Sequence, residues 1–492
     1  MPTEPVPSPA LPHGRPAEEV LSELRALRAQ DAPTRGGRTF AYVYDSGLAG
    51  VDELAAAAYT AFATVNGLDM TVFPSVARLE NDVVGAAVAL LGTPGAQGTF
   101  TSGGTESILL AVKTARDHAR AVSGVTDPQL LLPSTAHAAF HKAASYLGLE
   151  TVTVPVDRES LRADAAAMAA AITGRTALVV ASAPSYAHGV IDPVAEIAAA
   201  AAARGVLCHV DACIGGWLLP HLRRAGREVP PFDLSVPGVT SLSVDLHKYG
   251  YADKGASVVL YRDAELRRHQ YFAHAGWPGY PVVNPTVQGT KSAGLLAQAW
   301  AVQRHIGEDG YRVLAERTAE AADRLLPGLR AMEGVRVLGD PGAGLVAFTL
   351  LGAGGAPDLS LLLHLADEMR ERGWYLQPQL SFDGLPPNLH LTLTPASAGL
   401  VDALLADLDA ALKTARTLPA VAVDPAVTQF AAGLDPDTLG PEEVEGVLAF
   451  AGLGSGSGLP RRMAPVLMLL DALPGPLKER LLTEFVGSVF RV

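Results

Sequence analysis

The sequence predicts an α/β fold with a mainly parallel central sheet and helices on both faces, followed by a smaller C-terminal α+β domain. Two observations predict it. Between residues 129 and 261, short apolar segments alternate with helical ones for most of the length, a rhythm typical of parallel strands joined by crossover helices. Beyond residue 330, short strands and longer helices follow in a different order. The 492 residues, of which 49% are hydrophobic, suffice for two or three domains with a large core.

The expected elements can be followed along the chain. A Pro-rich tail precedes an amphipathic helix over residues 16–30, in which Val20, Leu24 and Leu27 share one face. Helices over 52–63 and 75–91 lead into the alternating part. Its strands are expected at 129–133, 151–154, 177–182, 206–210, 239–244 and 256–261, and its helices at 136–147, 160–172 and 193–204. Then come a helix at 308–329, strands at 335–338, 345–350 and 389–393, helices at 358–372 and 398–416, and a helical end with a Gly/Ser break at 452–458.

These elements divide into three expected parts. Residues 1–75 form an N-terminal tail and docking segment, residues 76–310 a large domain that carries the main sheet, and residues 311–492 a small α+β domain with a helical tail. Because ligands of parallel sheets bind beyond the carboxyl ends of the strands, we expect the functional site in the second part.

Composition narrows the possible functions. The net charge of −13 argues against nucleic-acid binding through bulk charge, although it leaves room for a local phosphate pocket. Cys208 and Cys213 are the only cysteines, so we expect neither a disulfide framework nor a metal centre of thiolates, and a reducing cytoplasm is the expected compartment. No apolar run reaches about 18 residues and the N-terminus lacks a signal-peptide pattern, so no membrane span is expected.

The stretch SVDLHKYGYADKGASVVL, at residues 243–260, carries the strongest chemical signal. His247, Lys248 and Lys254 lie there between two apolar strands, in a chain with only seven lysines. An amine can lose its proton when it is buried and can then add to a carbonyl, which an Arg side chain does not do. This favours a Schiff base with pyridoxal phosphate (PLP). The alternative is a surface turn with a solvated lysine.

Three further features fit the same cofactor. The turn Ser102-Gly103-Gly104-Thr105 precedes a helix, whose free N–H groups and positive end bind phosphate. Asp211 ends an apolar strand, where a carboxylate can keep a pyridine nitrogen protonated. His137, at a helix start, can cover the cofactor ring. Each feature alone could be an ordinary helix cap or surface residue, but their occurrence in one α/β domain favours a PLP site.

Five long segments add a family resemblance: TSGGTESILLA (101–111), AHAAFHKAASY (136–146), SAPSYAHGVIDP (182–193), HVDACIGG (209–216) and SVDLHKYGYADKG (243–255). In this order they resemble the group II PLP-dependent decarboxylase superfamily, and within it most closely the sphingosine-1-phosphate lyases of the soluble bacterial type. The resemblance extends from about residue 39 to the last helix. It implies the fold type I architecture of PLP-dependent transferases, which is similar to that of aspartate aminotransferase.

The resemblance implies a role for each matching residue. Lys248 would hold PLP as a Schiff base, Asp211 would pair with the pyridinium nitrogen and His137 would stack on the ring. His247 would help the turn Ser102-Gly103-Gly104-Thr105 to hold the cofactor phosphate.

The resemblance also implies a homodimer with its active site at the subunit interface. Gly289 and Thr290 would reach the cofactor phosphate in the neighbouring subunit. Tyr44, Tyr249 and Lys254 match positions at the substrate end, where Lys254 would contact a substrate phosphate.

One loop departs from the lyases, which read N-P-L-H-x-D-V-F-P where this chain has NGLDMTVFP at 66–74. Asn66 is kept as a candidate substrate residue. Asp69 stands in place of a His, and a carboxylate is unfavourable beside a phosphate. Lys291, in GTK, replaces the Arg of a G-S-R segment. It keeps the positive charge but lacks the paired N–H donors of a guanidinium group.

The sequence therefore predicts a PLP-dependent carbon–carbon lyase acting on an amino-bearing small molecule. Lys254 favours an aldehyde-lyase that cleaves a phosphorylated long-chain amino alcohol to an aldehyde and phosphoethanolamine. Asp69 favours the alternative, an amino-acid decarboxylase of the glutamate and aromatic amino-acid group, because its carboxylate could bind an amine-bearing side chain. Retention of Lys248, Asp211 and His137 together opposes a third reading, a non-catalytic scaffold of this fold.

Overall fold

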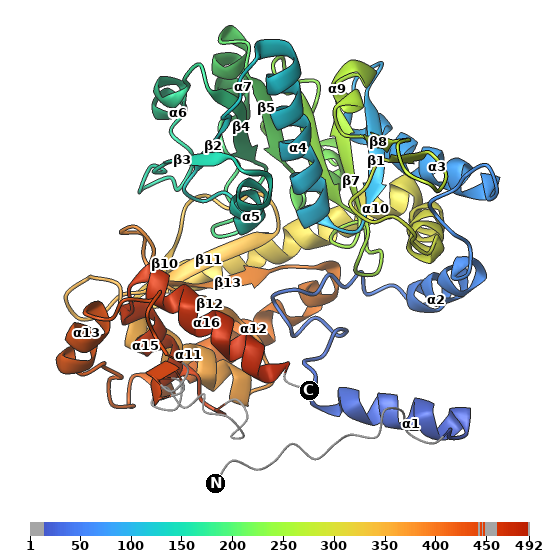
Figure 1. Cartoon of the computed structure of the whole chain (residues 1–492). Coiled ribbons are helices and arrows are strands. Elements are labelled where there is room, and N and C mark those ends of the chain that lie inside the picture. Colours follow the sequence, from blue (N-terminus) through green and yellow to red (C-terminus); the bar gives the residue numbers. More distant parts are fainter. Residues whose placement is uncertain (1–13, 441–442, 445, 448–459, 491–492) are drawn as a thin grey trace.

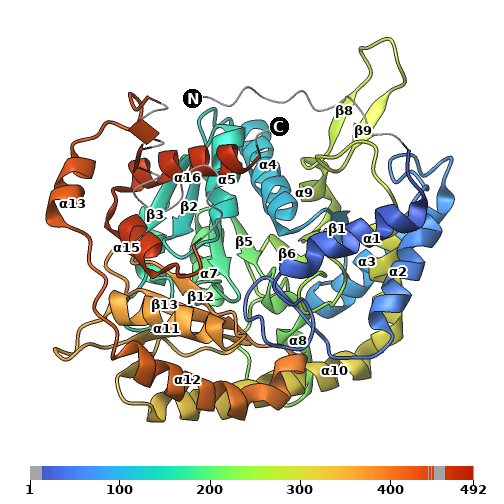
Figure 2. The ribbon, with the colours of Figure 1, turned by 90° about the horizontal axis from the view of Figure 1, so that it is seen from below.

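The computed structural model describes residues 14–440, 443–444, 446–447 and 460–490. The first part of the predicted tail and the predicted Gly/Ser break at 452–458 lie outside these residues. Figure 1 shows an upper body built on the central sheet and a lower body formed by C-terminal elements. The long helix α10 (Gly294–Ala331) passes along both, as the view from below in Figure 2 also shows.

The central sheet has seven strands in the order β1-β7-β6-β5-β4-β2-β3. Six of them run parallel, and β7 is antiparallel to both of its neighbours. The predicted mainly parallel sheet is therefore confirmed. Its strands are β1 (Gln97–Thr101), β2 (Gln129–Pro133), β3 (Glu150–Val154), β4 (Thr176–Ser182), β5 (Leu207–Asp211), β6 (Ser241–Asp245) and β7 (Ser257–Tyr261).

Helices cover both faces of this sheet because alternate strand residues point in opposite directions. Leu178 and Val180 of β4 pack in one cluster with apolar residues of α4 and α5, whereas Val179 and Ala181 join a second cluster on the other face. The helices are α3 (Pro74–Leu91), α4 (Gly104–Ser123), α5 (Ala138–Leu147), α6 (Ala165–Ala171), α7 (Val194–Ala203), α8 (Leu219–Arg224) and α9 (Ala264–Arg268).

The smaller C-terminal part is built on an antiparallel sheet, in the order β10-β11-β13-β12. Helices α11 and α12 and the second half of α10 cover it, which agrees with the predicted α+β arrangement. Its elements are β10 (Val335–Val337), β11 (Leu345–Leu350), α11 (Leu359–Glu371), β12 (Gln377–Gln379), β13 (Asn388–Thr392) and α12 (Val401–Ala415), and α13 (Pro425–Ala432), α15 (Ala464–Ala472) and α16 (Gly475–Val489) follow.

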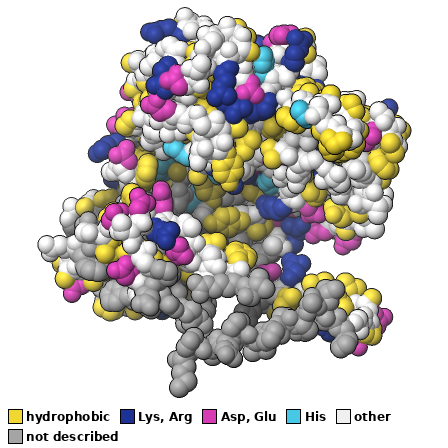
Figure 3. Space-filling model, viewed as in Figure 1, with side chains coloured by type: hydrophobic (Ala, Val, Ile, Leu, Met, Phe, Trp, Pro, Cys, Tyr) yellow, Lys and Arg dark blue, Asp and Glu magenta, His cyan; other side chains and the backbone are white. Residues whose placement is uncertain are grey.

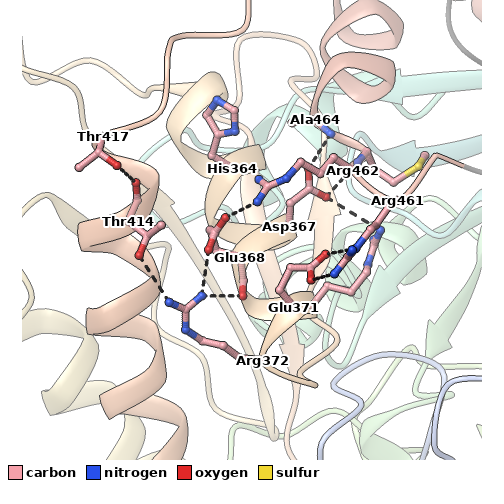
Figure 4. A network of polar contacts seen from close by, with 12 residues as sticks. His364, Asp367, Glu368, Glu371, Arg372, Thr414, Thr417, Arg461, Arg462 and Ala464 are labelled. Atoms are coloured by element: carbon pink, nitrogen blue, oxygen red, sulfur yellow. Dashed lines mark hydrogen bonds and ion pairs between the residues drawn. The ribbon is translucent and has the colours of Figure 1, made fainter.

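Helix α15 is attached to α11 by a polar network (Figure 4). Asp367 is buried and accepts hydrogen bonds from the backbone N–H groups of Met463 and Ala464, at 2.9 and 3.0 Å, where α15 begins. Arg462 pairs with Glu368 at 2.6 Å. These contacts fix the C-terminal helices on the small domain.

Several elements differ from the sequence predictions, which also gave no strand at β1 or β12 and no helix at α8 or α9. The helix predicted at 160–172 begins only at Ala165, because Asp157 captures the N–H of Ser160 in a turn and Asp192 takes the N–H of Ala163. Helix α10 begins at Gly294, well before the predicted residue 308, and its first part is separated by the non-helical Gly307 (φ 64°). The predicted domain boundary at 310 thus falls inside one helix. The hairpin of β8 (Phe272–His274) and β9 (Val282–Asn284) was not predicted.

The predicted amphipathic helix near the N-terminus is present as α1 (Ala17–Leu27), and α2 (Val51–Phe62) follows it. None of the residues of α1 is buried, and Leu24 and Leu27 are 54% and 70% exposed. Figure 1 shows α1 standing apart from the rest of the chain. Among the described residues, no helix combines the length and the hydrophobicity needed to cross a bilayer.

Candidate active site

A cavity of about 360 Å³ opens at the carboxyl ends of β4, β5 and β6. The register places these ends side by side, since Ser182 pairs with Asp211 and Asp211 with Ser243. In the space-filling view, hydrophobic, histidine and basic side chains gather in a hollow between the upper and lower bodies (Figure 3). The cavity lining includes Ser102, Gly103, Gly104, Thr105, Glu106, His137, Pro184, Tyr186, Asp211, Cys213, Asp245, His247 and Lys248.

The predicted phosphate turn forms one wall of this cavity. Gly103 caps α4 with a φ of 146°, a backbone conformation that favours glycine. A Cβ on Gly104 would lie 2.7 Å from Asp245 Oδ2 and 2.8 Å from Cys213 Sγ, so no side chain fits there. Gly103 and Gly104 therefore leave the backbone of the turn uncovered by side chains at the positive end of a twenty-residue helix. This is the geometry that an anion needs.

Lys248 follows β6 and points into the cavity beside a carboxylate that the sequence analysis did not single out. Its Nζ lies 3.0 Å from Oδ2 of Asp245, whose side chain is 3% exposed. Burial is the largest single influence on Lys248 and opposes its charge, but the attraction of Asp245 combines with smaller contributions from neighbouring groups, and together they raise the pKa of the amine. His247 Nε2 lies 3.6 Å from the same carboxylate oxygen.

Asp211 and His137 line the cavity from neighbouring elements. Asp211 is the last residue of β5, and its Oδ1 accepts a hydrogen bond from the N–H of Cys213 at 3.1 Å. His137 caps α5, since its Nδ1 accepts from the N–H of Ala139 at 3.1 Å. Its ring stands edge-on to Tyr186 at a centroid distance of 6.5 Å. The structure thus brings the turn, Asp211, His137, His247 and Lys248 together in the lining of one cavity.

The predicted substrate residues Tyr44 and Lys254 form a pair next to these groups. Lys254 Nζ lies 5.2 Å from the centre of the Tyr44 ring. Burial of the amine, with repulsion from Lys248, lowers the pKa of Lys254 to about 8. Burial raises the pKa of Tyr44 to about 12. Tyr249 is different, because it is buried and donates its hydroxyl to the carbonyl of Leu393 at 2.8 Å.

The remaining predicted residues lie outside the cavity of the single chain. Asn66 forms an isolated bridge with Ser292, and the N–H of Gly67 donates to the carbonyl of Lys291 at 2.7 Å. The loop at 66–73 is therefore packed against the segment that carries Gly289 and Thr290, both of which are exposed.

The carboxylate of Asp69 is used within this loop. Its Oδ1 accepts hydrogen bonds from the N–H and hydroxyl of Thr71, at 2.9 and 2.6 Å, and from the N–H of Val72. The hydrogen bonds from Thr71 lower the pKa of Asp69. Asp69 therefore closes a turn and does not line the cavity.

The residues of this cavity fit PLP by their chemistry. Lys248 supplies the amine, Asp211 a carboxylate for the pyridine nitrogen, His137 a ring surface and the glycine turn an anion site. Asp245 Oδ1 is a buried oxygen without a hydrogen-bond partner among the described residues. The predictions missed this carboxylate, although Asp245 ends a buried strand just as Asp211 does.

The comparisons with known proteins agree with this fit. Residues 16–351 match the family described as the pyridoxal-dependent decarboxylase conserved domain. Residues 425–488 match one described as the C-terminal putative HTH domain of pyridoxal-dependent enzymes.

Comparison with individual relatives indicates to which group of this family the chain belongs. Sphingosine-1-phosphate lyase of Arabidopsis thaliana is 40% identical over 409 residues, which cover 82% of this chain and 73% of that one. The structure of a sphingosine-1-phosphate lyase from Burkholderia pseudomallei matches with a TM-score of 0.78 at 35% identity, over 89% of this chain and 99% of that one. Glutamate decarboxylase of Lactobacillus brevis shares the fold, with a TM-score of 0.74 at 19% identity, over 85% and 97% of the two chains. The chain therefore belongs to the pyridoxal-dependent decarboxylase family, in the group of the sphingosine-1-phosphate lyases, and is a PLP-dependent carbon–carbon lyase.

Proposed function

We propose that this enzyme is an aldehyde-lyase that cleaves a phosphorylated long-chain amino alcohol to a long-chain aldehyde and phosphoethanolamine. The observation that carries this proposal is the position of Lys254. Its amine lies against the Tyr44 ring. The positive charge of the nearby Lys248 also contributes to the lowered pKa of this amine. Within the described part of the chain, no carboxylate oxygen lies within 4.0 Å of Lys254 Nζ, so the amine is available to a substrate phosphate.

The other predicted site residues would bind the cofactor or the substrate. PLP held by Lys248 supplies an electron sink for the electrons released when a bond to the amine-bearing carbon breaks. Asp211 would keep the pyridine nitrogen protonated, His137 would cover the ring, and His247 with the glycine turn would hold the cofactor phosphate. Lys254 and Tyr44 would hold the phosphate end of the substrate. Asn66 and Tyr249 stay predictions as substrate residues.

The amino-acid decarboxylase alternative also fits the family, but in the single chain Asp69 adds little support to it. That alternative depended on a free carboxylate at Asp69 to bind an amine-bearing side chain. Both the pKa of Asp69 and its geometry are set by hydrogen bonds within its own turn. A scaffold without activity is not retained, since the chain is a member of a lyase family with its lysine in place.

We also propose that the enzyme is a homodimer and that it acts in the cytoplasm. Two features of the single chain support the dimer. Helix α1 leaves its apolar residues exposed, and so does the region of the β8–β9 hairpin, where Phe272 and Val283 are 57% and 60% exposed. A partner subunit would cover these residues and receive Gly289 and Thr290 at its cofactor phosphate. The two cysteines, Cys208 and Cys213, are both free and buried, which suits a reducing compartment.

Product analysis of the PLP-loaded enzyme tests the activity. A phosphorylated long-chain amino alcohol and a panel of amino acids are supplied separately, and aldehyde, phosphoethanolamine and CO₂ are measured. Aldehyde and phosphoethanolamine in equal amounts are expected, and Lys248→Ala should yield neither. Release of CO₂ from an amino acid without any aldehyde would overturn the proposal and assign the enzyme to the decarboxylases.

Co-expression of two inactive variants tests whether each active site is completed by residues of the neighbouring subunit. Lys248→Ala and Thr290→Asp are each expected to be inactive, the second because it brings a carboxylate to the partner's phosphate. If Thr290 acts in the neighbouring subunit, co-expression of the two variants restores an intact site in every mixed dimer, or about one quarter of all sites. No restored activity, or an active holoenzyme that is monomeric by light scattering, contradicts the shared site.

A further inference from the structure

Asp245 occupies a central place among the groups of the cavity. It is the last residue of β6, it is buried, and its Oδ2 lies 3.0 Å from Lys248 Nζ and 3.6 Å from His247 Nε2. The same carboxylate lies directly behind Gly104, where it would meet any added Cβ. One buried anion is thus in contact with the Schiff-base lysine, the histidine and the phosphate turn.

Asp211 and Asp245, two of the three carboxylates that line the cavity, are placed for different tasks. Asp211 ends the adjacent strand β5 and is bonded to the N–H of Cys213. It influences the charge of Lys248 less than Asp245 does, and no ion pair within 4.0 Å joins Asp211 to a basic side chain in the described ranges. Asp211 therefore stays available to a pyridine nitrogen, whereas Asp245 is committed to an amine.

We propose that Asp245 is a positioning residue that fixes Lys248 Nζ over the cavity and keeps this nitrogen positively charged, whether it is free or bonded to PLP. The inference rests on the proposed attachment of PLP to Lys248 and not on the identity of the substrate. A nitrogen held as an ammonium group can donate a proton but cannot accept one. Lys248, once released, is therefore a proton donor to the substrate carbon, and removal of the substrate hydroxyl proton falls to another group.

The test is a spectroscopic titration without substrate. The absorbance band of the PLP-loaded protein is followed against pH in the wild type and in Asp245→Asn, which keeps the shape of the side chain and removes its charge. The midpoint at which the Lys248 nitrogen loses its proton is expected to fall by about 1 to 3 pH units, the usual effect of an opposite charge in contact. Asp233→Asn is the matched control, because Asp233 is a buried carboxylate that does not line the cavity. Its midpoint should equal that of the wild type.

Two outcomes overturn the proposal: a midpoint in Asp245→Asn that equals the wild-type value, or an equal fall in Asp233→Asn. A second measurement applies if Asp245→Asn folds but does not take up PLP. Acetylation of Lys248 is then followed against pH in the cofactor-free proteins by peptide mass spectrometry.

The labelling midpoint should exceed the ordinary lysine value of about 10.4 in the wild type and should fall in the variant. Equal midpoints in the two proteins overturn the proposal. Neither measurement uses a substrate, so a failure to cleave the phosphorylated amino alcohol would leave the result on Asp245 unaffected.

Discussion

Glu106 accepts a hydrogen bond from the backbone N–H of Val287, a residue far along the chain, at 2.7 Å through its Oε1. Its Oε2 accepts from the N–H of Ser102 at 2.6 Å. One buried carboxylate thus joins the phosphate turn to the segment that leads to Gly289 and Thr290. In the proposed dimer, Glu106 would tie the cofactor site of its own subunit to the residues that complete the partner's site.

Replacement of this carboxylate should weaken cofactor binding. Glu106→Gln leaves one neutral acceptor oxygen for two N–H groups, so one N–H loses its acceptor at a cost of about 1–3 kcal/mol. The dissociation constant of PLP, measured by titration of the cofactor-free protein, should rise by up to roughly five- to 150-fold. Glu196→Gln, at an exposed position in the first turn of α7, is the control and should bind PLP like the wild type. Equal affinities in both variants would contradict this role of Glu106.

Binding of a phosphorylated substrate should depend on the charge of Lys254. Since the pKa of Lys254 is lowered to about 8, its positive charge is lost as the pH rises through that value. The KM for the phosphorylated amino alcohol is expected to rise between about pH 7 and pH 9.5, a range in which the phosphate stays doubly charged. Lys254→Arg should remove this rise, because a guanidinium group stays protonated. A KM that changes equally with pH in both proteins would show that another group is responsible.

The contribution of Asp192 to the free energy of unfolding should decrease as the pH rises. Burial raises the pKa of Asp192 to about 6, although the N–H groups of Ala163 and Ser182 donate to it at 2.9 and 2.8 Å. The folded state therefore holds this proton more tightly than the unfolded state, and the contribution of Asp192 to the free energy of unfolding falls as the pH rises from about 4 to 6.

The measurement is urea unfolding of the wild type and Asp192→Asn at pH 4 and pH 7. Other titrations cancel in the difference between the two proteins. That difference, wild type minus variant, should fall by about 2–3 kcal/mol between the two pH values. A difference that does not change with pH is the contrary result.

The attachment of the C-terminal helices should depend on a buried carboxylate more than on an exposed ion pair. Asp367→Ala leaves the N–H groups of Met463 and Ala464 without their acceptor, at a cost of about 1–3 kcal/mol. Limited proteolysis should then cut the C-terminal helices faster. The control is Arg461→Ala, which breaks an ion pair with Glu371 at a largely exposed position (Figure 4). Such pairs contribute little, so its digestion should match the wild type.

Site residues could be predicted from the sequence where their chemistry depends on the residue type and on a position at the end of a strand. Lys248 and Asp211 each follow an apolar strand, and the parallel order of the sheet brings them to one edge. Asp245 obeys the same rule, but its task depends on a 3.0 Å contact across a turn, which no spacing specifies. Glu106 is indistinguishable in sequence from an ordinary acidic residue in the first turn of a helix. Its second partner comes from a segment that only the folded chain brings near.

The positions of the residues expected at the substrate end of the site were harder to predict, because they too depend on contacts that residue spacing does not specify. Asp69 and Lys291 stand out in sequence as departures from the lyases, and their positions in a single chain depend on local turns. Oδ1 of Asp69 accepts the hydrogen bonds of its own turn, and Lys291 donates to the hydroxyl of Thr286 at 3.2 Å. What these side chains face beyond their own chain is set by the quaternary arrangement, which hydrophobic periodicity does not encode.

Helix α10 has a consequence for how the molecule unfolds. Leu296, Val302 and Leu314 belong to the core under the central sheet, and Leu325 and Leu329 of the same helix belong to the core of the small domain. Melting either core would remove the apolar contacts of one part of the helix, and the other part would then fray from the boundary between the two cores, between Ala315 and Ala321. We therefore expect the two cores to unfold together, and a fragment cut between them would contain a helix with an uncovered apolar face.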